Sequence, residues 1–311
     1  RDSSTSRGLG DVYKRQWLKD VDIPSDRSSW SAFSIAQERV EQQVSAIIGE
    51  AASQKNAKAG SEAQKMGDFY TSYVDEARRN QLGLAPLKAE LARIKGVKDK
   101  RGMAELMAHF ERIGVGAPFG MGVGQDNRDS TRYIVNISQS GLGMPNRDYY
   151  LQDEARLKDT RGKYQQHVAR MLALAGHQDA EAKAARIVAL ETEIARAQWS
   201  AVENRDPVKR YNKMSLAELR KLAPGIDWDV YFKGVGVAGK LDAVIVSQPS
   251  YMAALDKLVA ATPMDTWQPY FEFRLLSAYA PYLSKAFVDE SFAFRGTVLG
   301  GATANRPVEK L

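Results

Sequence analysis

The sequence predicts a mainly α-helical fold, a multi-helix array with one small β-hairpin at about residues 117–138. Apolar residues recur at spacings of three and four through most of the chain, whereas this one segment alternates at a spacing of two. With 311 residues and 44% apolar content, the chain can bury a substantial core. Zero cysteines exclude disulfides, thiolate catalysis and cysteine-ligated zinc.

The first hundred residues carry helical patterns. Residues 33–53 and 62–79 have apolar side chains at an approximately helical spacing, so two amphipathic helices are expected to pack together. Gly83 and Pro86 interrupt the pattern before it resumes, and residues 103–113 form a further helix.

The hairpin is predicted from two alternating segments. Residues 119–123 alternate apolar side chains with glycine, and residues 133–137 form a second alternating set. Between them, residues 125–130 are rich in turn formers, which favours a hairpin connection.

Helices resume after Tyr150. The patterns predict helices over 153–175 and 180–199, separated by Gly176, with Asp179 placed to cap the second helix.

Three later helix ends carry local signals. Ser215 and Glu218 fit a capping box, and Thr262 followed by Pro263 fits an N-cap with proline at the first helical position. A last helical pattern ends near Leu299, before Gly300 and Gly301, and is predicted to run into an uncapped tail.

Charge and hydropathy narrow the possible partners. The formal charge is +6, and residues 1–16 contribute +2 of it, from four basic and two acidic residues, which leaves +4. That remainder is spread along helical patterns, so we expect a solvated surface and no nucleic-acid partner. Charges interrupt every apolar stretch well before the roughly 18 residues that a membrane span needs.

The three histidines do not form a zinc-binding helix. Such a helix needs two imidazoles four residues apart and a glutamate beside the first. His109 has isoleucine four positions later, His167 has methionine there, and His177 lies at a turn. We therefore predict no metal ligand and no catalytic residue in this chain.

Two other functional patterns, a dinucleotide-binding loop and a paired acid and base, are excluded by their positions in the predicted elements. Residues 234–239 fit Gly-x-Gly-x-x-Gly, but they follow a helix-like stretch and precede the strand-like run 243–246, the reverse of a dinucleotide fold. Glu191 and Glu193 point to different faces of their helix, which argues against a paired acid and base.

A series of short motifs resembles the neprilysin-like zinc metallopeptidases. The run Gly141–Leu151 is the most informative, and the others follow in family order. They are Ile23–Asp26 with Phe33, Phe69–Asp75 with Gly83 and Leu87, Glu191 with Ala195, Glu203–Asp206, Tyr211–Asn212, Pro224–Trp228, Pro249–Tyr251, and Phe292–Phe294 with Gly300. The resemblance spans Trp17 to about Gly301.

This resemblance implies part of a secreted or membrane-anchored zinc endopeptidase that cleaves short peptides inside a closed cavity. Residues 17–311 would be an incomplete amino-terminal helical domain that caps the cavity and limits substrate size. The zinc ligands and the general base would lie beyond Leu311, in a carboxyl-terminal catalytic domain. The fragment alone is therefore predicted to be inactive, since a metallopeptidase needs its metal-activated water.

Ser29 and Ser34 are the candidate substrate-contact residues. Mammalian relatives carry an arginine four residues before the phenylalanine that matches Phe33 and an aspartate just after it, and these help hold the substrate's carboxyl end. Serines at both positions put a preference for a free carboxylate in doubt. Solvent-exposed or helix-cap roles are favoured over strong substrate contacts for both serines.

Residues 1–16 match nothing in the family and lack the apolar region of a secretory signal, so they are interpreted as a leader foreign to the natural protein. The resemblance suggests an extracytoplasmic location, and the missing cysteines suggest a bacterial source. Two alternatives stay open, a non-catalytic peptide-binding module and a helical interaction module. A peptidase fragment should expose an apolar docking face, whereas a finished module should not.

Overall fold

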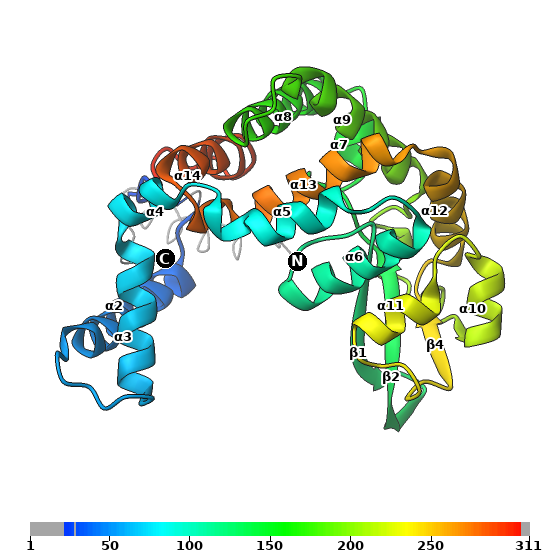
Figure 1. Cartoon of the computed structure of the whole chain (residues 1–311), viewed down its shortest axis with the longest axis horizontal. Coiled ribbons are helices and arrows are strands. Elements are labelled where there is room, and N and C mark those ends of the chain that lie inside the picture. The colour runs from blue at the N-terminus through cyan, green and yellow to red at the C-terminus, as the bar shows by residue number, and fades with distance from the viewer. Residues whose placement is uncertain (1–21, 28, 306–311) are drawn as a thin grey trace, which may run out of the picture. The chain divides into compact units, whose positions relative to one another are not determined.

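The computed structural model describes residues 22–27 and 29–305. The predicted leader, residues 1–16, lies outside these ranges. The chain forms two compact units, unit 1 with Arg1–Ala77 and Phe292–Leu311, and unit 2 with Arg78–Ser291. Each unit is described separately below (Figure 1).

Unit 1 is built on two helices, α2 (Ala32–Ser53) and α3 (Glu62–Val74). Ser31 caps α2 through a reciprocal capping box with Ser34, and Ser61 caps α3 by accepting the Gln64 N–H. A π-helix, η4 (Phe292–Leu299), returns the chain to this unit. The Thr303 and Ala304 N–H groups both donate to the Ser25 carbonyl at 3.0 Å, which joins the two ends of unit 1.

The predicted single helix over 62–79 is wrong. Helix α3 ends at Val74, Asp75 adopts ψ 78, and α4 (Glu76–Leu82) starts afresh. The Arg79 guanidinium donates to the Pro281 carbonyl at 3.2 Å, and the Asn80 side chain accepts the Lys285 N–H at 2.7 Å. These contacts join residues about 200 positions apart, so local periodicity contains no trace of them.

Unit 2 contains most of the helices. After the 3₁₀ turn η1 (Ala85–Leu87), the α-helices are α5 (Lys88–Lys95), α6 (Lys100–Ile113), α7 (Asp148–Leu151), α8 (Ala155–Leu174), α9 (Ala180–Ala197), α10 (Leu216–Leu222), α11 (Trp228–Gly234), α12 (Pro249–Ala261), α13 (Met264–Tyr279) and α14 (Lys285–Ser291). Two short 3₁₀ turns, η2 (Glu203–Arg205) and η3 (Ala280–Tyr282), complete the set. The helices dominate the described residues, as predicted.

The predicted hairpin is confirmed as β1 (Phe119–Asp126) and β2 (Asp129–Gln139), but it belongs to a larger sheet. Strand β4 (Ala243–Val246) pairs parallel to β2, and β3 (Lys213–Ser215) pairs antiparallel to β4, giving the order β1-β2-β4-β3. Residues 234–239 connect α11 to β4, so they follow a helix and precede a strand, as the sequence indicated.

The helix caps match the predictions unevenly. Ser215 and Glu218 form the predicted capping box. Asp179 makes no cap hydrogen bond, because its carboxylate lies 2.8 Å from the Lys183 ammonium instead. Thr262 ends α12, and Pro263 takes the N-cap position of α13, so this helix starts one residue later than predicted.

The predicted uncapped tail after the last helical pattern is also wrong. Gly301 adopts φ 73, and the Ala302 N–H donates to the Gly296 carbonyl at 2.9 Å. The Gly301 N–H donates to the Thr297 carbonyl at 2.9 Å, so two carbonyls in the last turn of η4 are satisfied.

The main core lies in unit 2 and is aromatic. Phe119 on β1 packs against Trp228 and Tyr231 of α11, with ring centroids 5.4 and 4.9 Å apart. Trp267 and Phe271 of α13 stack at 5.8 Å, and both are fully buried. The contacts of Phe119 join segments more than 100 positions apart in sequence and pack the sheet against α11.

Candidate functional site

The two predicted contact residues, Ser29 and Ser34, line the same surface cavity in unit 1. Its volume is about 350 Å³, and Asp26, Arg27, Phe292 and Gly296 also line it. Helix η4 supplies the wall opposite the start of α2, so two segments more than 250 residues apart form one site. The structure brings the two candidates together on one cavity.

Charge at this cavity differs from that of a simple carboxylate receptor. The Arg27 guanidinium is already paired with the Glu41 carboxylate at 2.8 Å, and both side chains are largely buried. One carboxylate oxygen of Asp26 is buried and has no hydrogen-bond partner among the described atoms. Ser34 is engaged in capping α2, since its hydroxyl accepts the Ser31 N–H at 3.2 Å, so a cap role for Ser34 is confirmed.

A second polar site lies inside unit 2, beneath the run Gly141–Leu151. Glu191 of α9 is fully buried and accepts hydrogen bonds from the Tyr150 and Tyr164 hydroxyls at 2.6 and 2.8 Å. Its other carboxylate oxygen has no partner among the described atoms. Burial raises the pKa of the Glu191 carboxyl, although the nearby Arg274 guanidinium and both tyrosines act to lower it.

Conformation and close contacts explain the glycines of this run. Gly141 has φ 98, and a Cβ there would lie 2.8 Å from the Pro118 Cα. A Cβ on Gly143 would collide with the Tyr164 hydroxyl. The Gly143 and Met144 N–H groups donate to the Tyr150 hydroxyl at 3.1 and 3.0 Å. The run is therefore bonded to the hydroxyl of its own Tyr150, which in turn donates to Glu191.

The sequence analysis did not anticipate this buried network. It correctly placed Glu191 and Glu193 on different faces, since Glu193 is exposed while Glu191 is buried. Tyr150 and Tyr164 are both buried as well. The joining of a core carboxylate to two core hydroxyls was missed, and the only available signal was a glutamate on the buried stripe of a helix.

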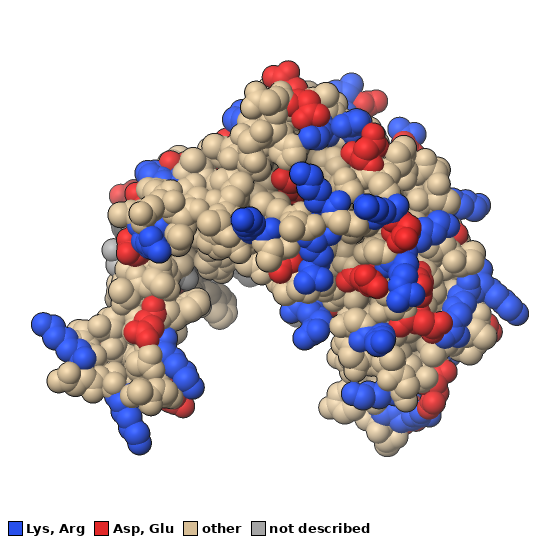
Figure 2. Space-filling model, viewed as in Figure 1, with Lys and Arg blue, Asp and Glu red and all other residues tan. Residues whose placement is uncertain are grey.

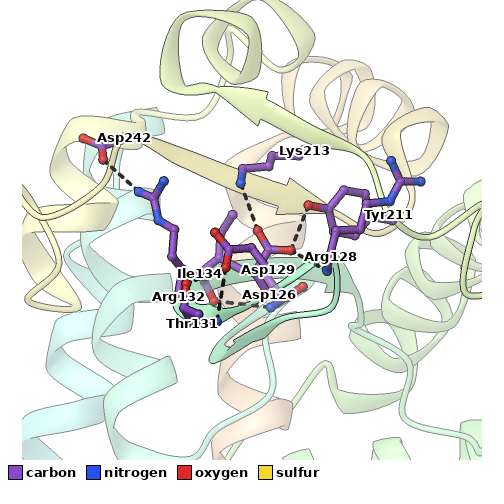
Figure 3. A network of polar contacts seen from close by, with 10 residues as sticks. Asp126, Arg128, Asp129, Thr131, Arg132, Ile134, Tyr211, Lys213 and Asp242 are labelled. Atoms are coloured by element: carbon purple, nitrogen blue, oxygen red, sulfur yellow. Dashed lines mark hydrogen bonds and ion pairs between the residues drawn. The ribbon is translucent and has the colours of Figure 1, made fainter.

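A third polar cluster ties the hairpin to the rest of the sheet (Figure 3). Asp126, at the end of β1, is buried and accepts from the Lys213 ammonium at 2.9 Å and the Tyr211 hydroxyl at 2.8 Å. The hydrogen bond from Lys213 is the main reason that the pKa of Asp126 is held well below its usual range. The Arg128 guanidinium lies 4.2 Å from the centre of the Tyr211 ring. These contacts give the family block Tyr211–Asn212 a structural role.

The histidines are each committed to one glutamate. His109 lies 2.7 Å from Glu90, His167 lies 2.8 Å from Glu290, and His177 lies 2.8 Å from Glu272. In residues 22–27 and 29–305, no group of three histidine, aspartate or glutamate side chains is placed to hold a metal ion. The described residues therefore do not fit a zinc site.

The charge distribution on the surface and the length and apolar character of the helices limit the kinds of partner that can be proposed. Lys and Arg are interspersed with Asp and Glu over the face drawn in Figure 2, which is the pattern of a solvated surface. Within the described ranges, none of the helices combines the length and the apolar character of a membrane-spanning segment.

Comparison with known proteins places the chain in a family. Residues 15–310 match the amino-terminal model of peptidase family M13. The endothelin-converting enzyme homolog of Locusta migratoria is 26% identical over 94% of this chain and 42% of its own length. Human endothelin-converting enzyme 1 is 25% identical over 91% of this chain and 38% of its own length.

Solved structures agree with the sequence comparisons. The Mycobacterium tuberculosis zinc metalloprotease Zmp1, in complex with an inhibitor, is 37% identical, with a TM-score of 0.90 over 94% of this chain and 45% of that chain. The PepO structure from Lactobacillus rhamnosis shares the fold, with a TM-score of 0.79 at 19% identity. The chain thus spans less than half the length of these relatives, and it belongs to peptidase family M13, the neprilysin-like metallopeptidases, whose amino-terminal domain it matches.

Proposed function

We propose that this chain is the amino-terminal lobe of a zinc metalloendopeptidase that hydrolyses short peptides. The observation that carries the proposal is the 37% identity to the M. tuberculosis zinc metalloprotease, maintained across 94% of this chain at a TM-score of 0.90. In the proposed whole protein, this lobe caps the substrate cavity and limits substrate size, and zinc is bound by residues outside the chain. The same resemblance supports an extracytoplasmic location.

A peptidase assay tests whether hydrolysis requires residues outside this chain. The 311-residue chain and the longer product of its gene, read to the next in-frame stop codon, are incubated with quenched fluorescent peptides and zinc. We expect hydrolysis only by the longer product, abolished by a chelator and restored by zinc, because the attacking water needs the metal. Zinc-dependent hydrolysis by the 311-residue chain alone would refute the proposed inactivity of this lobe.

The cavity at Ser29 and Ser34 is proposed to contact substrate in the whole protein. Its support is the joint placement of both serines on one cavity wall, beside a buried Asp26 oxygen and an Arg27 side chain already paired with Glu41. With the nearby guanidinium neutralised, the described residues of this wall offer no free cation for a substrate carboxylate. We therefore propose that the enzyme does not depend on a free carboxyl end in its peptides.

A substitution that creates a preference for peptides with a free carboxyl end tests whether Ser29 contacts substrate in the longer product. The substitution Ser29→Arg is expected to lower KM for a peptide with a free carboxyl end relative to its amidated twin, by roughly tenfold for a charge-assisted contact of about 1.5 kcal/mol. Ser53→Arg is the matched control, since Ser53 is an exposed serine at the far end of the same helix. Equal KM ratios for the two variants would remove Ser29 from the substrate site.

A further inference from the structure

A cavity lies beside the β1–β2 hairpin in unit 2. Its volume is about 330 Å³, and strands β1, β2 and β3 line it together with residues 237–243, which lead into and begin β4. The parallel pairing of β2 with β4 and the antiparallel pairing of β3 with β4 hold these segments in register. The cavity walls are therefore parts of one sheet and of the connection that enters it.

The apolar part of this cavity includes two large side chains that the fold leaves in solvent. Tyr133 is 81% exposed and Val123 is 60% exposed, whereas Ile134 and Val135, which also line the cavity, are buried. Val123 is paired with Val135, two positions along β2 from Tyr133, so Val123 and Tyr133 are diagonal neighbours on one face of the sheet. An apolar group placed in the cavity would cover both exposed side chains.

The lining also carries three cations, Arg132, Lys213 and Lys240. The Lys213 ammonium lies 2.9 Å from the buried Asp126 carboxylate, yet 37% of the Lys213 side chain is exposed. The Lys240 ammonium donates to the Gly236 carbonyl at 3.3 Å, and in the described ranges it has no carboxylate partner. Lys213 is thus held in place at the cavity, and the charge of Lys240 is left uncompensated.

Arg132 is only weakly committed to its partner. Its guanidinium lies 3.3 Å from the Asp242 carboxylate, and the two side chains are 59 and 90% exposed (Figure 3). Ion pairs this exposed contribute little, so a ligand carboxylate can replace Asp242. With three cations against Asp126 and Asp242, the lining has a net charge of 3 − 2 = +1. Asp126 is buried, so the accessible part of the cavity is more positive than this sum.

We propose that this cavity binds an acidic peptide segment of another protein, with a large apolar side chain against Tyr133 and Val123 and a carboxylate beside Arg132 and Lys240. The inference goes beyond the proposed function, because this binding needs neither zinc nor hydrolysis. Charge complementarity favours a carboxylate at the cationic side chains, and the exposed apolar side chains favour an apolar residue next to it. An anion without an apolar group would leave Tyr133 and Val123 in water.

Fluorescence anisotropy with the 311-residue chain tests the site. The probe is a labelled peptide of sequence Gly-Glu-Glu-Phe-Glu-Glu-Gly, and two matched peptides replace its phenylalanine by alanine or all its glutamates by glutamine. Each matched peptide should bind about fivefold more weakly, because it lacks the aromatic or the charged contacts. Added salt should weaken binding of the first peptide. Equal affinities for the three peptides would overturn the proposal.

Variants locate the binding on the chain. Tyr133→Ser and Lys240→Glu should each weaken binding of the phenylalanine peptide by about fivefold. Lys257→Glu is the matched control, since Lys257 is an exposed lysine of α12 outside the cavity lining, and it should change binding by less than about twofold. The exposed position of Tyr133 predicts an unchanged urea midpoint for Tyr133→Ser, so lost binding would not reflect unfolding. Equal losses in the two lysine variants would reduce the effect to net charge and remove the site.

The longer gene product separates this proposal from the proposed function. It should bind the phenylalanine peptide as tightly as the 311-residue chain does. Binding by the 311-residue chain alone would assign the cavity to the rest of the polypeptide and overturn an external partner. A longer product that binds the peptide but hydrolyses nothing refutes the proposed function alone, while zinc-dependent peptidase activity without peptide binding by either protein refutes this site alone.

Discussion

Removing the carboxylate of Glu191 should destabilise unit 2 strongly. In Glu191→Ala, the buried Tyr150 and Tyr164 hydroxyls both lose their acceptor, at 2.6 and 2.8 Å in the native structure. A buried donor left unsatisfied costs about 1–3 kcal/mol, so the loss should be about 2–6 kcal/mol. Domains of this size are stable by only about 5–15 kcal/mol, so the effect should be large.

Urea unfolding followed by tryptophan fluorescence measures this loss, because Trp228 and Trp267 are both buried in unit 2. Glu193→Ala is the control on the same helix, since the Glu193 side chain is 55% exposed and its ion pair among the described residues is with the exposed Arg196 at 3.5 Å. The control should change the unfolding free energy by no more than about 0.5 kcal/mol. If Glu191→Ala cost no more than Glu193→Ala, the buried network would not stabilise the fold and the reasoning would fail.

The same carboxylate predicts a pH dependence with a definite sign. Burial raises the pKa of Glu191 in the folded state above its ordinary 4.5. A raised pKa means that the folded state binds the proton more tightly, so stability is fully present below about 4.5 and is lost as pH rises through the folded pKa. Glu191→Gln cannot ionise at this position. As pH rises above 4.5, the unfolding free energy of the wild type should therefore fall relative to that of this variant.

Three further predictions concern other parts of the chain. Gly67→Ala should loosen α2 and α3, raising their amide hydrogen exchange by an amount equivalent to about 1–3 kcal/mol, because the new methyl group meets the Ala51 carbonyl. Gly49 has open space around it, so Gly49→Ala should slow amide exchange in α2 by an amount equivalent to about 0.5–1 kcal/mol. Faster exchange in Gly49→Ala than in Gly67→Ala would contradict the close approach of α2 and α3 at Gly67. Asp126 has a folded pKa below 3.8, so its contribution to stability is present above that pH and is lost as pH falls below it; Asp126→Asn should flatten this part of the unfolding curve. Ser215→Ala removes the hydroxyl that accepts the Glu218 N–H, while the N–H of residue 215 can still donate to the Glu218 carboxylate. The unfolding free energy should fall by about 1 kcal/mol, and no change in the urea midpoint would remove that role.

Local signals predicted most of the elements in this fold. Periods of 3.6 and 2 located the helices and the hairpin, and the Ser215 cap needed only residues 215–218. The parallel pairing of β4 with β2 was not predicted, because it joins residues more than 100 positions apart and leaves no local pattern. The break at Asp75 was missed for the same reason, since the bonds of Arg79 and Asn80 to residues 281–285 are not encoded near the break.

The candidate sites were predicted less completely than the fold. The resemblance identified Ser29 and Ser34, and the structure places both on one cavity, but their chemistry depends on the pairing of Arg27 with Glu41, which is a tertiary contact. The resemblance likewise marked Tyr150 and Glu191 in separate motifs. Their hydrogen bond crosses 41 positions of sequence, so only the folded chain shows that the two motifs form one network.

The two units differ in the hydrogen bonding of their polar motif residues and in the burial of their apolar motif residues. In unit 2 two family motifs bond to each other, as Tyr150 does to Glu191 at 2.6 Å, and the aromatic core is closed around them. In unit 1 the motif residue Phe33 is 87% exposed and Phe69 is 73% exposed, although both occupy family blocks. A large apolar residue is costly to leave in water, with about 1.5–3 kcal/mol to gain from its burial. The fold of this chain alone therefore accounts for the burial and bonding of the unit 2 motifs, whereas it leaves the aromatic motif residues Phe33 and Phe69 of unit 1 exposed.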